Sequence, residues 1–362
     1  MRILIVSTWF PSADRPDIAP FNVAHAKAIT RNHDVQVVHA QLGGSGPIRQ
    51  EEYAGLPVTR VPINPRRPLA VARSLSTLRR LVRGADVVHS MAFSSLGVLA
   101  PLYPVIGKRW VHTEHWSGTA FPDRIPGVWQ RLSAARHLLR LPRRVSTVSS
   151  VLAEAIAKFA RRDAVDVIPC VVDESFRPVP QPSWTPLKLV AVGGLVTGKR
   201  PQSAVDTVRE LVATGVDTHL TWVGDGALHD EIRERITEYG LADRIDLVGA
   251  VSPEKVADHV RAANLFFLPT AFETFLAAGA EAIACGRPVV LPNTGGFTDY
   301  VTEANGVIIE QDDPKTLAQA VQQARDRFAD VSADTISATG TSRFSEETIA
   351  EKFDEFYSHL EK

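Results

Sequence analysis

The sequence predicts an α/β protein of two doubly wound, Rossmann-like domains, and three observations lead to this prediction. The chain has 362 residues, which is long for one hydrophobic core and suits two domains. Short apolar runs rich in Val, Ile and Leu alternate with amphipathic stretches. Because these runs lack clean in–out alternation, they are typical of parallel strands that helices cover on both faces. The third observation is a proline-rich segment near the middle of the chain.

Strands are expected where short apolar runs stand between turn residues. The expected strands are 2–6, 35–39, 58–61, 87–89, 110–113, 145–148 and 165–168 in the first half, and 187–192, 218–223, 245–247, 265–268, 288–291 and 306–309 in the second. The clearest helices are expected at 202–214, 228–239, 253–262, 277–285 and 314–328. Asp313 followed by Pro314 predicts a capped helix start.

The domain boundary is expected in residues 176–186, which carry four prolines and so disfavour both helix and central strand. This segment is predicted to be a linker between an N-terminal domain of residues 1–175 and a C-terminal domain of residues 187–344. Residues 345–362 are expected to form a terminal helix.

The two halves differ in charge, although the net charge of the chain is only −1. Residues 1–180 hold 24 Lys and Arg against 13 Asp and Glu, and residues 181–362 hold 16 against 28. The basic half is consistent with an anionic partner or a membrane surface, but two mutually complementary surfaces would give the same imbalance. A basic amphipathic helix at 66–83 and a second basic stretch at 131–144 fit a membrane surface. For the helix at 66–83, we favour the alternative that it packs on its sheet and leaves a solvated basic face.

The cysteine content and the N-terminus indicate a reducing compartment. Cys170 and Cys285 are the only two cysteines, so no disulfide framework is implied. No apolar run reaches the roughly 18 residues of a membrane span, and the apolar start is too short for a signal-peptide core. We expect a cytoplasmic protein, with peripheral attachment to the inner face of the cell membrane as a further option.

Two carboxylates lie near the end of the expected strand 265–268. Glu273 falls in the following loop, where parallel sheets bind ligands, and the amides of Thr274, Phe275 and Leu276 are expected to be free at the start of the next helix. Glu281 stands alone on an otherwise apolar helix and needs a polar partner. A sugar hydroxyl pair would satisfy Glu281. The alternative is that Glu273 is a charge in the first turn of the helix and that Glu281 forms a salt bridge.

Seven residues separate these glutamates, and the stretch resembles the Glu-x7-Glu region of the retaining, GT-B-fold glycosyltransferases of family 4. Five more segments resemble the same family in the same order: 167–173, 192–200, 222–226, 244–249 and 293–299, the last with Asp299 where the family usually has Glu. The resemblance covers nearly the whole chain and implies an acceptor-side N-terminal domain, a donor-binding C-terminal domain, a central cleft and a terminal helix that crosses back to the first domain.

The resemblance also implies roles for single residues. Lys199 would contact the donor diphosphate, Glu281 the ribose hydroxyls, and Glu273 the transferred sugar, where it would help to stabilise charge near the anomeric carbon. Thr274, Phe275 and Leu276 would donate amides to phosphate and sugar. Other expected donor-binding residues are Arg200, Gly194, Gly224, Asp225 and Val248. No cofactor and no metal are expected.

In the first half, the resemblance implies that His115 contacts the donor sugar as a second catalytic residue, whereas His112 is expected to be structural. A zinc site is disfavoured because only one cysteine stands in that half. The expected acceptor-side residues are Pro20, Trp116 and Ser117. Trp116 could stack on a sugar or belong to the core.

Two positions depart from the family pattern. Many relatives carry glycine where this chain has Ala19-Pro20, and often arginine where it has Gly194. Another cation, such as Arg15 or Arg200, could compensate.

The expected function is retaining, metal-independent transfer of a hexose from a UDP- or GDP-sugar to a hydroxyl of an acceptor. The basic first half of the chain favours an acceptor that is anionic or associated with a membrane. No nucleic acid partner is expected. The departures leave a second hypothesis open, a non-catalytic or weakly active sugar-nucleotide-binding protein on the same fold. A sugar-nucleotide epimerase or a phosphorylase would also share the architecture, although no segment indicates the pyridoxal-bound lysine that a phosphorylase needs.

Overall fold

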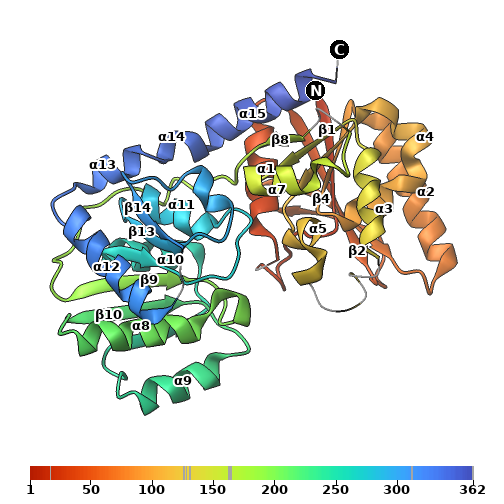
Figure 1. Cartoon of the computed structure of the whole chain (residues 1–362). Coiled ribbons are helices and arrows are strands. Elements are labelled where there is room, and N and C mark those ends of the chain that lie inside the picture. The colour runs from red at the N-terminus through yellow and green to blue at the C-terminus, as the bar shows by residue number, and fades with distance from the viewer. Residues whose placement is uncertain are drawn as a thin grey trace. The chain divides into compact units, whose positions relative to one another are not determined.

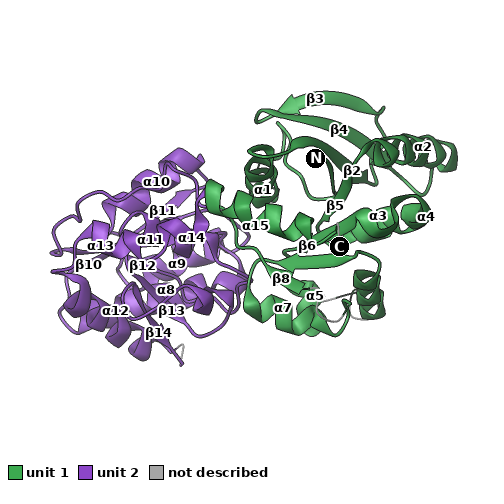
Figure 2. Cartoon of the chain, turned by 90° about the horizontal axis from the view of Figure 1, so that it is seen from above, with its two compact units in different colours: residues 1–171, 346–362 green, residues 172–345 purple. Residues whose placement is uncertain are grey.

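The fold is described by a computed structural model, which covers residues 1–16, 18–124, 127, 129, 132–161, 165–310 and 313–360. Asp17 of the first loop and Arg131 of the second basic stretch lie outside these residues. The chain divides into unit 1, residues 1–171 with 346–362, and unit 2, residues 172–345 (Figure 2). The chain therefore leaves unit 1 once and returns to it for its last helix, as the resemblance implied.

Unit 1 contains an eight-stranded sheet in the order β3-β4-β2-β1-β5-β6-β7-β8. Its strands are β1 Arg2–Ser7, β2 Asp34–Leu42, β3 Arg49–Tyr53, β4 Leu56–Ile63, β5 Val87–Met91, β6 Trp110–Glu114, β7 Arg144–Thr147 and β8 Val165–Val167. Its helices are α1 Pro20–Thr30, α2 Pro68–Gly84, α3 Ser94–Leu99, α4 Tyr103–Ile106, α5 Ser117–Ala120, α7 Ser150–Ala157 and α15 Glu346–Ser358.

One strand of unit 1 was not predicted. The edge strand β3 pairs with β4 in the antiparallel direction, so this sheet is not purely parallel. The sequence of β3, Arg-Gln-Glu-Glu-Tyr, has no apolar run because the strand lies at the sheet edge and its residues remain partly or fully exposed. The pattern that marked the buried strands therefore could not mark this one.

Unit 2 contains a six-stranded parallel sheet in the order β11-β10-β9-β12-β13-β14. Its strands are β9 Leu187–Val192, β10 Thr218–Val223, β11 Ile245–Gly249, β12 Leu265–Phe267, β13 Val289–Pro292 and β14 Gly306–Ile309. Its helices are α8 Pro201–Ala213, α9 His229–Glu238, α10 Pro253–Ala262, α11 Ala277–Ala284, α12 Pro314–Phe328, α13 Ala333–Ala338 and α14 Thr341–Phe344. Helices α8, α9 and α12 pack together on one face, and α10 packs with α11 on the other (Figure 1). The Asp313 side chain caps α12 as expected.

The proline-rich segment 176–186 lies within unit 2 and is fastened to it. The buried Arg287 guanidinium donates hydrogen bonds to the carbonyl oxygens of Val179 (3.0 Å) and Pro180 (3.2 Å). Asn264 donates to the carbonyl oxygen of Pro182 at 3.1 Å. The change of unit falls between residues 171 and 172, ahead of the expected linker. The sequence could not indicate this, because it does not show which carbonyls a distant arginine will bind.

The C-terminal helix α15 completes the core of unit 1. It packs along α1, and its apolar side chains Ile349, Phe353, Phe356 and Tyr357 join the core formed by β1, β2 and β5. The basic helix α2 also packs on unit 1, burying Leu78 and Val82, while its arginines Arg73, Arg79, Arg80 and Arg83 stay exposed.

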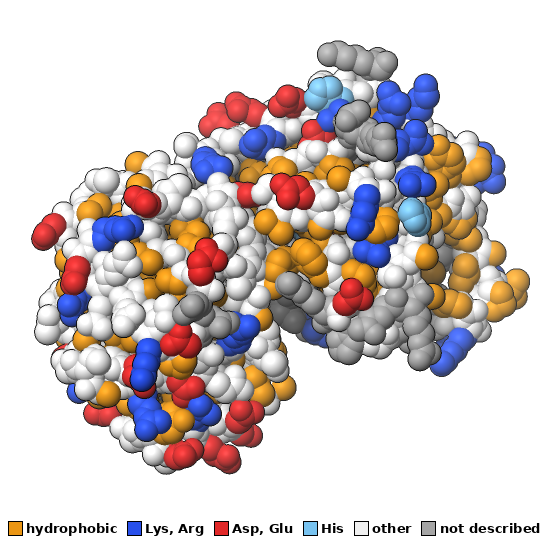
Figure 3. All heavy atoms as spheres, viewed as in Figure 1, with side chains coloured by type: hydrophobic (Ala, Val, Ile, Leu, Met, Phe, Trp, Pro, Cys, Tyr) orange, Lys and Arg blue, Asp and Glu red, His pale blue; other side chains and the backbone are white. Residues whose placement is uncertain are grey.

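On the face drawn in Figure 3, Lys and Arg side chains are frequent over unit 1, and Asp and Glu side chains lie among Lys and Arg side chains at the lower end of unit 2. No described helix combines the length and the apolar character that crossing a bilayer requires.

Candidate functional site

The strand order of unit 2 creates a binding edge between β9 and β12. Chain order within this sheet runs outward in both directions from that pair, so the loops after β9 and β12 diverge and leave room for a ligand at the carboxyl ends of the strands. Lys199 follows β9 and Glu273 follows β12. The topology therefore brings together two residues that are 74 positions apart in the sequence.

Lys199 and Glu273 form an ion pair, with 2.5 Å between Nζ and Oε1. Thr270 donates a hydrogen bond from Oγ1 to the same carboxylate oxygen at 2.7 Å. The Glu273 backbone is held as well, because Gly296 donates its N–H to the Glu273 carbonyl oxygen at 3.0 Å. Gly295 makes this approach possible, since a Cβ there would collide with that oxygen. Lys199 and Glu273 are therefore both held at the edge between β9 and β12.

The turn into α11 contains a run of backbone amides that no described group accepts. Leu276 precedes the helix in the left-handed conformation (φ 63°), so α11 begins at Ala277. Among the residues that the structure describes, no acceptor is found for the N–H groups of residues 274–278. Five free amides beside a lysine make a favourable anion site.

The side chains of Phe275 and Leu276 are packed inside unit 2. Both are buried, and Phe275 packs against Tyr300 (5.2 Å between ring centroids) and Phe344 (5.5 Å). The Tyr300 hydroxyl donates to the Leu276 carbonyl oxygen at 2.7 Å and so fixes the left-handed turn. These two residues can therefore contribute only their backbone N–H groups.

Glu281 lies on α11 with its side chain mostly inside the unit. Within the described part of the chain its side chain has no hydrogen bond and no ion pair, which removes the alternative that Glu281 forms a salt bridge. Burial, helped by the negative charge of Asp173, raises its pKa to about 7. A carboxylate that the unit leaves unpaired is suited to hydrogen-bond donors from a ligand.

The remaining expected donor-binding residues lie in loops next to this edge. Gly224 packs against the backbone of Gly193, and a Cβ there would collide with the Gly193 carbonyl oxygen. Gly194 is partly buried, and a Cβ there would lie 3.3 Å from the Asp225 carbonyl oxygen. Arg200 caps α8 in the left-handed conformation (φ 51°), and Val248 is partly exposed near the end of β11.

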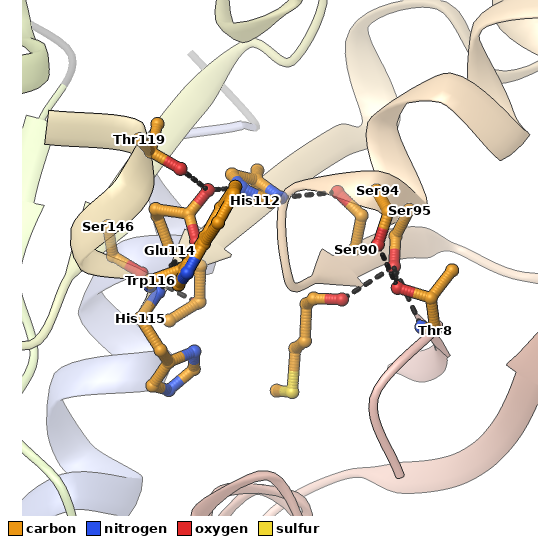
Figure 4. Close-up of polar contacts among 12 residues, drawn as sticks. Thr8, Ser90, Ser94, Ser95, His112, Glu114, His115, Trp116, Thr119 and Ser146 are labelled. Atoms are coloured by element: carbon orange, nitrogen blue, oxygen red, sulfur yellow. Dashed lines mark hydrogen bonds and ion pairs between the residues drawn. The ribbon is translucent and has the colours of Figure 1, made fainter. Parts of the chain in front are cut away.

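In unit 1, the residues after β6 are held by a buried carboxylate (Figure 4). Glu114 accepts the backbone N–H groups of His115 and Trp116, both at 2.9 Å, and the Thr119 hydroxyl at 3.1 Å. His112 lies at 3.4 Å from the same carboxylate and contacts Ser90 at 2.9 Å, so it belongs to the internal network, as expected. The His115 imidazole points away from this network (Figure 4).

The His115 ring is enclosed by helix α1. Phe21 stacks on it with 4.5 Å between ring centroids, and His25 lies 3.3 Å away, measured from Nδ1 of His25 to Nε2 of His115. Pro20 is the exposed first residue of α1. Sequence reasoning missed His25, because it stands in no motif and only the fold brings it to His115. Glu114 belongs to the ionisable stretch around His115, but its contacts with backbone N–H groups could not be predicted.

Trp116 lies in an aromatic group rather than alone. Its ring centroid is 5.9 Å from that of Trp9 and 4.9 Å from that of Trp129, and it remains partly exposed. Ser117 is the partly exposed first residue of α5. No group of three potential His, Cys, Asp or Glu ligands for a metal occurs among the described residues.

Comparison with known proteins agrees with this geometry. Residues 5–176 match the family described as Glycosyltransferase Family 4, and residues 186–326 match the one described as Glycosyl transferases group 1. Over 316 residues the chain is 30% identical to the 2-deoxystreptamine N-acetyl-D-glucosaminyltransferase of Streptomyces fradiae, covering 80% of this chain and 72% of that protein. The chain belongs to the family 4 glycosyltransferases.

Other relatives match this glycosyltransferase over shorter spans. The lipopolysaccharide core biosynthesis mannosyltransferase LpsB of Rhizobium meliloti is 39% identical over 119 residues, 31% of this chain and 33% of that protein. Thus the chain matches only about a third of the length of some curated relatives.

Among solved structures, Anabaena HepE in complex with UDP superposes with a TM-score of 0.80 at 18% identity, covering 99% of this chain and 100% of that one. Sucrose-phosphate synthase from Thermosynechococcus elongatus gives 0.74 at 20% identity, covering 99% of both chains. These likenesses show the fold, which is GT-B with two Rossmann-like units.

Proposed function

We propose that this glycosyltransferase is a retaining, metal-independent enzyme that moves a hexose from a UDP- or GDP-sugar to a hydroxyl of an acceptor. The observation that carries the proposal is the combination at the binding edge of unit 2: one ammonium, five free amides and two carboxylates. An ammonium and free amides suit a diphosphate, and carboxylates suit sugar hydroxyls.

The diphosphate would bind the amides of residues 274–278 together with Lys199. The Lys199 ammonium pairs with Glu273, and a donor phosphate would compete with that carboxylate for it. The Glu273 carboxylate would then accept hydrogen bonds from hydroxyls of the transferred sugar. Anabaena HepE has been solved with UDP and with UDP-glucose, which supports a donor of this chemical class.

The Glu281 carboxylate would accept hydrogen bonds from the two ribose hydroxyls. Its unpaired state and its raised pKa support this role, because two hydroxyl donors would stabilise the ionised form that the protein alone disfavours. Gly224, Asp225 and Val248 would surround the base, and Gly194 and Arg200 would lie near the phosphates.

In the transfer step, the bond between the anomeric carbon and the phosphate oxygen breaks while the acceptor oxygen attacks from the same face. The acceptor proton passes to an oxygen of the leaving diphosphate, so no separate base and no metal are needed. Lys199 and the amides stabilise the negative charge that develops on the leaving group. Glu273 stabilises positive charge near the anomeric carbon, and His115 accepts a hydrogen bond from a sugar hydroxyl.

The acceptor would be recognised by unit 1 near Pro20, Trp116 and Ser117. The loop departure at Ala19 does not argue for an inactive protein, because Ala19 takes up a left-handed conformation (φ 49°) that glycine adopts easily. A cytoplasmic location, with an anionic or membrane-associated acceptor, belongs to the same proposal and is supported by the excess of basic residues in residues 1–180.

The test is a panel of UDP- and GDP-hexoses scored by thermal shift, followed by turnover measured with EDTA present. A donor raises the melting temperature by mass action, and nucleotide release should persist in EDTA. NMR of the product should show the anomeric configuration of the donor. Binding without any turnover across acceptors would favour a sugar-nucleotide-binding protein, and an inverted anomer would overturn the retaining mechanism.

A further inference from the structure

Two buried histidines and a backbone carbonyl form a chain of hydrogen bonds in unit 1. His25 Nε2 lies 2.8 Å from the carbonyl oxygen of Pro169, and His25 Nδ1 lies 3.3 Å from His115 Nε2. Helix α1, the segment after β8 and the end of β6 each supply one member. Residues far apart in the sequence thus converge on one imidazole.

The chemistry of the carbonyl sets the direction of this chain. A carbonyl oxygen only accepts hydrogen bonds, so His25 Nε2 must carry the proton that lies between them. His25 is completely buried, and burial lowers its pKa to about 4, so its ring is neutral near neutral pH. A neutral imidazole with its proton on Nε2 has a lone pair on Nδ1. His25 can therefore only accept a hydrogen bond from His115.

The same logic continues to His115. Burial lowers its pKa well below the usual value, and the neighbouring histidines His25, His112 and His89 lower it further, so this ring is neutral as well. With its proton on Nε2, His115 keeps a lone pair on Nδ1. That atom is buried and has no hydrogen-bond partner among the residues that the structure describes. A buried acceptor without a donor is costly, and a ligand hydroxyl that donated to this atom would remove the cost.

His115 is held on one face of its ring and at its backbone. Phe21 stacks on one of its faces at 4.5 Å, and the Glu114 carboxylate accepts the backbone N–H group of His115 at 2.9 Å. Glu114 is the charged group nearest in the chain and binds the backbone rather than the ring, so it does not compete with His25 for the imidazole proton.

We propose that His25 is a positioning residue that holds His115 in the Nε2–H tautomer, leaving His115 Nδ1 to accept a hydrogen bond from a hydroxyl of the bound sugar. The sugar-binding half of this statement rests on the proposed function. The tautomer half concerns the free protein alone and can be measured without any substrate.

The tautomer is read from the ¹⁵N shifts of the His115 ring in the full-length protein, assigned with a His115→Gln variant. The wild type should show protonated Nε2 and bare Nδ1. His25→Phe keeps a ring but removes the acceptor, so His115 should become a mixture of tautomers. His25→Asn places an amide oxygen where Nδ1 was and should restore the Nε2–H form. A wild-type Nδ1–H tautomer, or an unchanged signal in His25→Phe, would overturn the proposal.

The matched control is His89→Phe, which removes another fully buried histidine of the same unit. His89 contacts Tyr357 and Thr113 and makes no hydrogen bond to His115, so this variant should leave the tautomer unchanged. A mixture of tautomers there would mean that any lost buried histidine disturbs His115, and it would overturn the specific role of His25.

Turnover separates the two halves of the proposal. With UDP-glucose as the probe donor, or the donor that the panel selects, His25→Phe should lower kcat/KM by about tenfold and His25→Asn should recover most of it. If the tautomer behaves as predicted but His115→Gln turns over normally, the sugar contact is overturned. If His115→Gln is inactive while His25→Phe keeps full turnover, the proposed function stands and the positioning role of His25 fails.

Discussion

The two units arrange their strands in a similar order but differ in the chemistry at the carboxyl ends of these strands. In unit 2 this edge holds ionisable groups and free amides: Lys199, Glu273 and Glu281 around the start of α11. In unit 1 the same edge holds the buried, neutral imidazole of His115, beside the Glu114 carboxylate, which binds the backbone N–H groups that follow it. In the proposed function, the edge of unit 2 would bind the charged diphosphate and the edge of unit 1 would bind hydroxyls. The fold alone does not decide between these roles, and the side chains at the edge do.

The units do share a backbone feature at this edge. A non-glycine residue in the left-handed conformation precedes a helix at Ala19 and Ala92 in unit 1 and at Arg200 and Leu276 in unit 2. Such residues cost about 1 kcal/mol or more, and they tend to persist where function requires them. Both units thus have a left-handed residue before a helix at this edge, and they differ in the side chains that lie beside that helix.

The largest expected effect comes from breaking the charged edge. Glu273→Gln keeps the size of the side chain but removes the charge near the anomeric carbon, so kcat should fall by about 10²–10³-fold. Product formation with the selected donor measures it. Glu303→Gln, an exposed position of the same unit, is the control and should turn over like the wild type. Equal turnover in the two variants would remove Glu273 from the mechanism.

Lowering the pH should change the stability of the two units in opposite directions. Histidines buried as neutral rings have a lower pKa in the folded than in the unfolded protein, so stability is lost as the pH falls below about 6.5. His25 alone, with a folded pKa of about 4, accounts for about 3 kcal/mol of this loss. Glu281 acts in the opposite direction, because its raised pKa makes unit 2 more stable as the pH falls from about 7.

Hydrogen exchange at about pH 7 and about pH 5, corrected for intrinsic rates, measures this contrast. Amides of unit 1 should lose protection first on acidification. The described histidines of unit 2, His219, His229 and His259, are all partly exposed and should contribute little. Protection lost first in unit 2 would contradict the contrast.

Lys199→Met should weaken binding of UDP by about 10–100-fold, because the diphosphate loses its one lysine contact while the amides remain. Calorimetric titration measures the affinity. Lys188→Met removes an exposed lysine of the same unit and serves as the control. Unchanged affinity in Lys199→Met would place the diphosphate elsewhere.

Glu281→Gln should increase stability and reduce binding together. A raised carboxyl pKa means that the ionised form destabilises the folded state above about pH 7, so at about pH 8 the variant should unfold with about 1–3 kcal/mol more free energy. Below about pH 4.5 the gain should vanish. Affinity for UDP should fall by about tenfold through the lost ribose contacts. Urea unfolding and titration test both halves, and a less stable variant at about pH 8 would contradict the account of its burial.

The smallest effect is expected at Ala19. Ala19→Gly relieves the left-handed strain but gives the unfolded chain more freedom, so the net gain should be below about 1 kcal/mol, with unchanged affinity for UDP. Ala54, left-handed in the β3–β4 turn, provides a matched Ala54→Gly control away from the helix start. A loss of more than about 1 kcal/mol at Ala19 alone would mean that the methyl group packs usefully there.

Local pattern and motif spacing predicted a large part of this structure. The buried strands and the Glu273–Glu281 pair stood in short stretches whose apolar content or spacing marks them directly. β3 was missed because an exposed edge strand needs no apolar run. The attachment of 176–186 by Arg287, the ion pair of Lys199 with Glu273 and the approach of His25 to His115 depend on contacts between distant segments. No local pattern encodes such contacts.

The most direct test of the central claim is the shift of backbone amide resonances when UDP is added in the presence of EDTA. If the turn into α11 binds the diphosphate, the ¹H–¹⁵N signals of residues 274–278 should move most, and Lys199→Met should require more UDP for the same change. If UDP binds and the signals of these five amides do not shift, the charged edge of unit 2 is not the donor site.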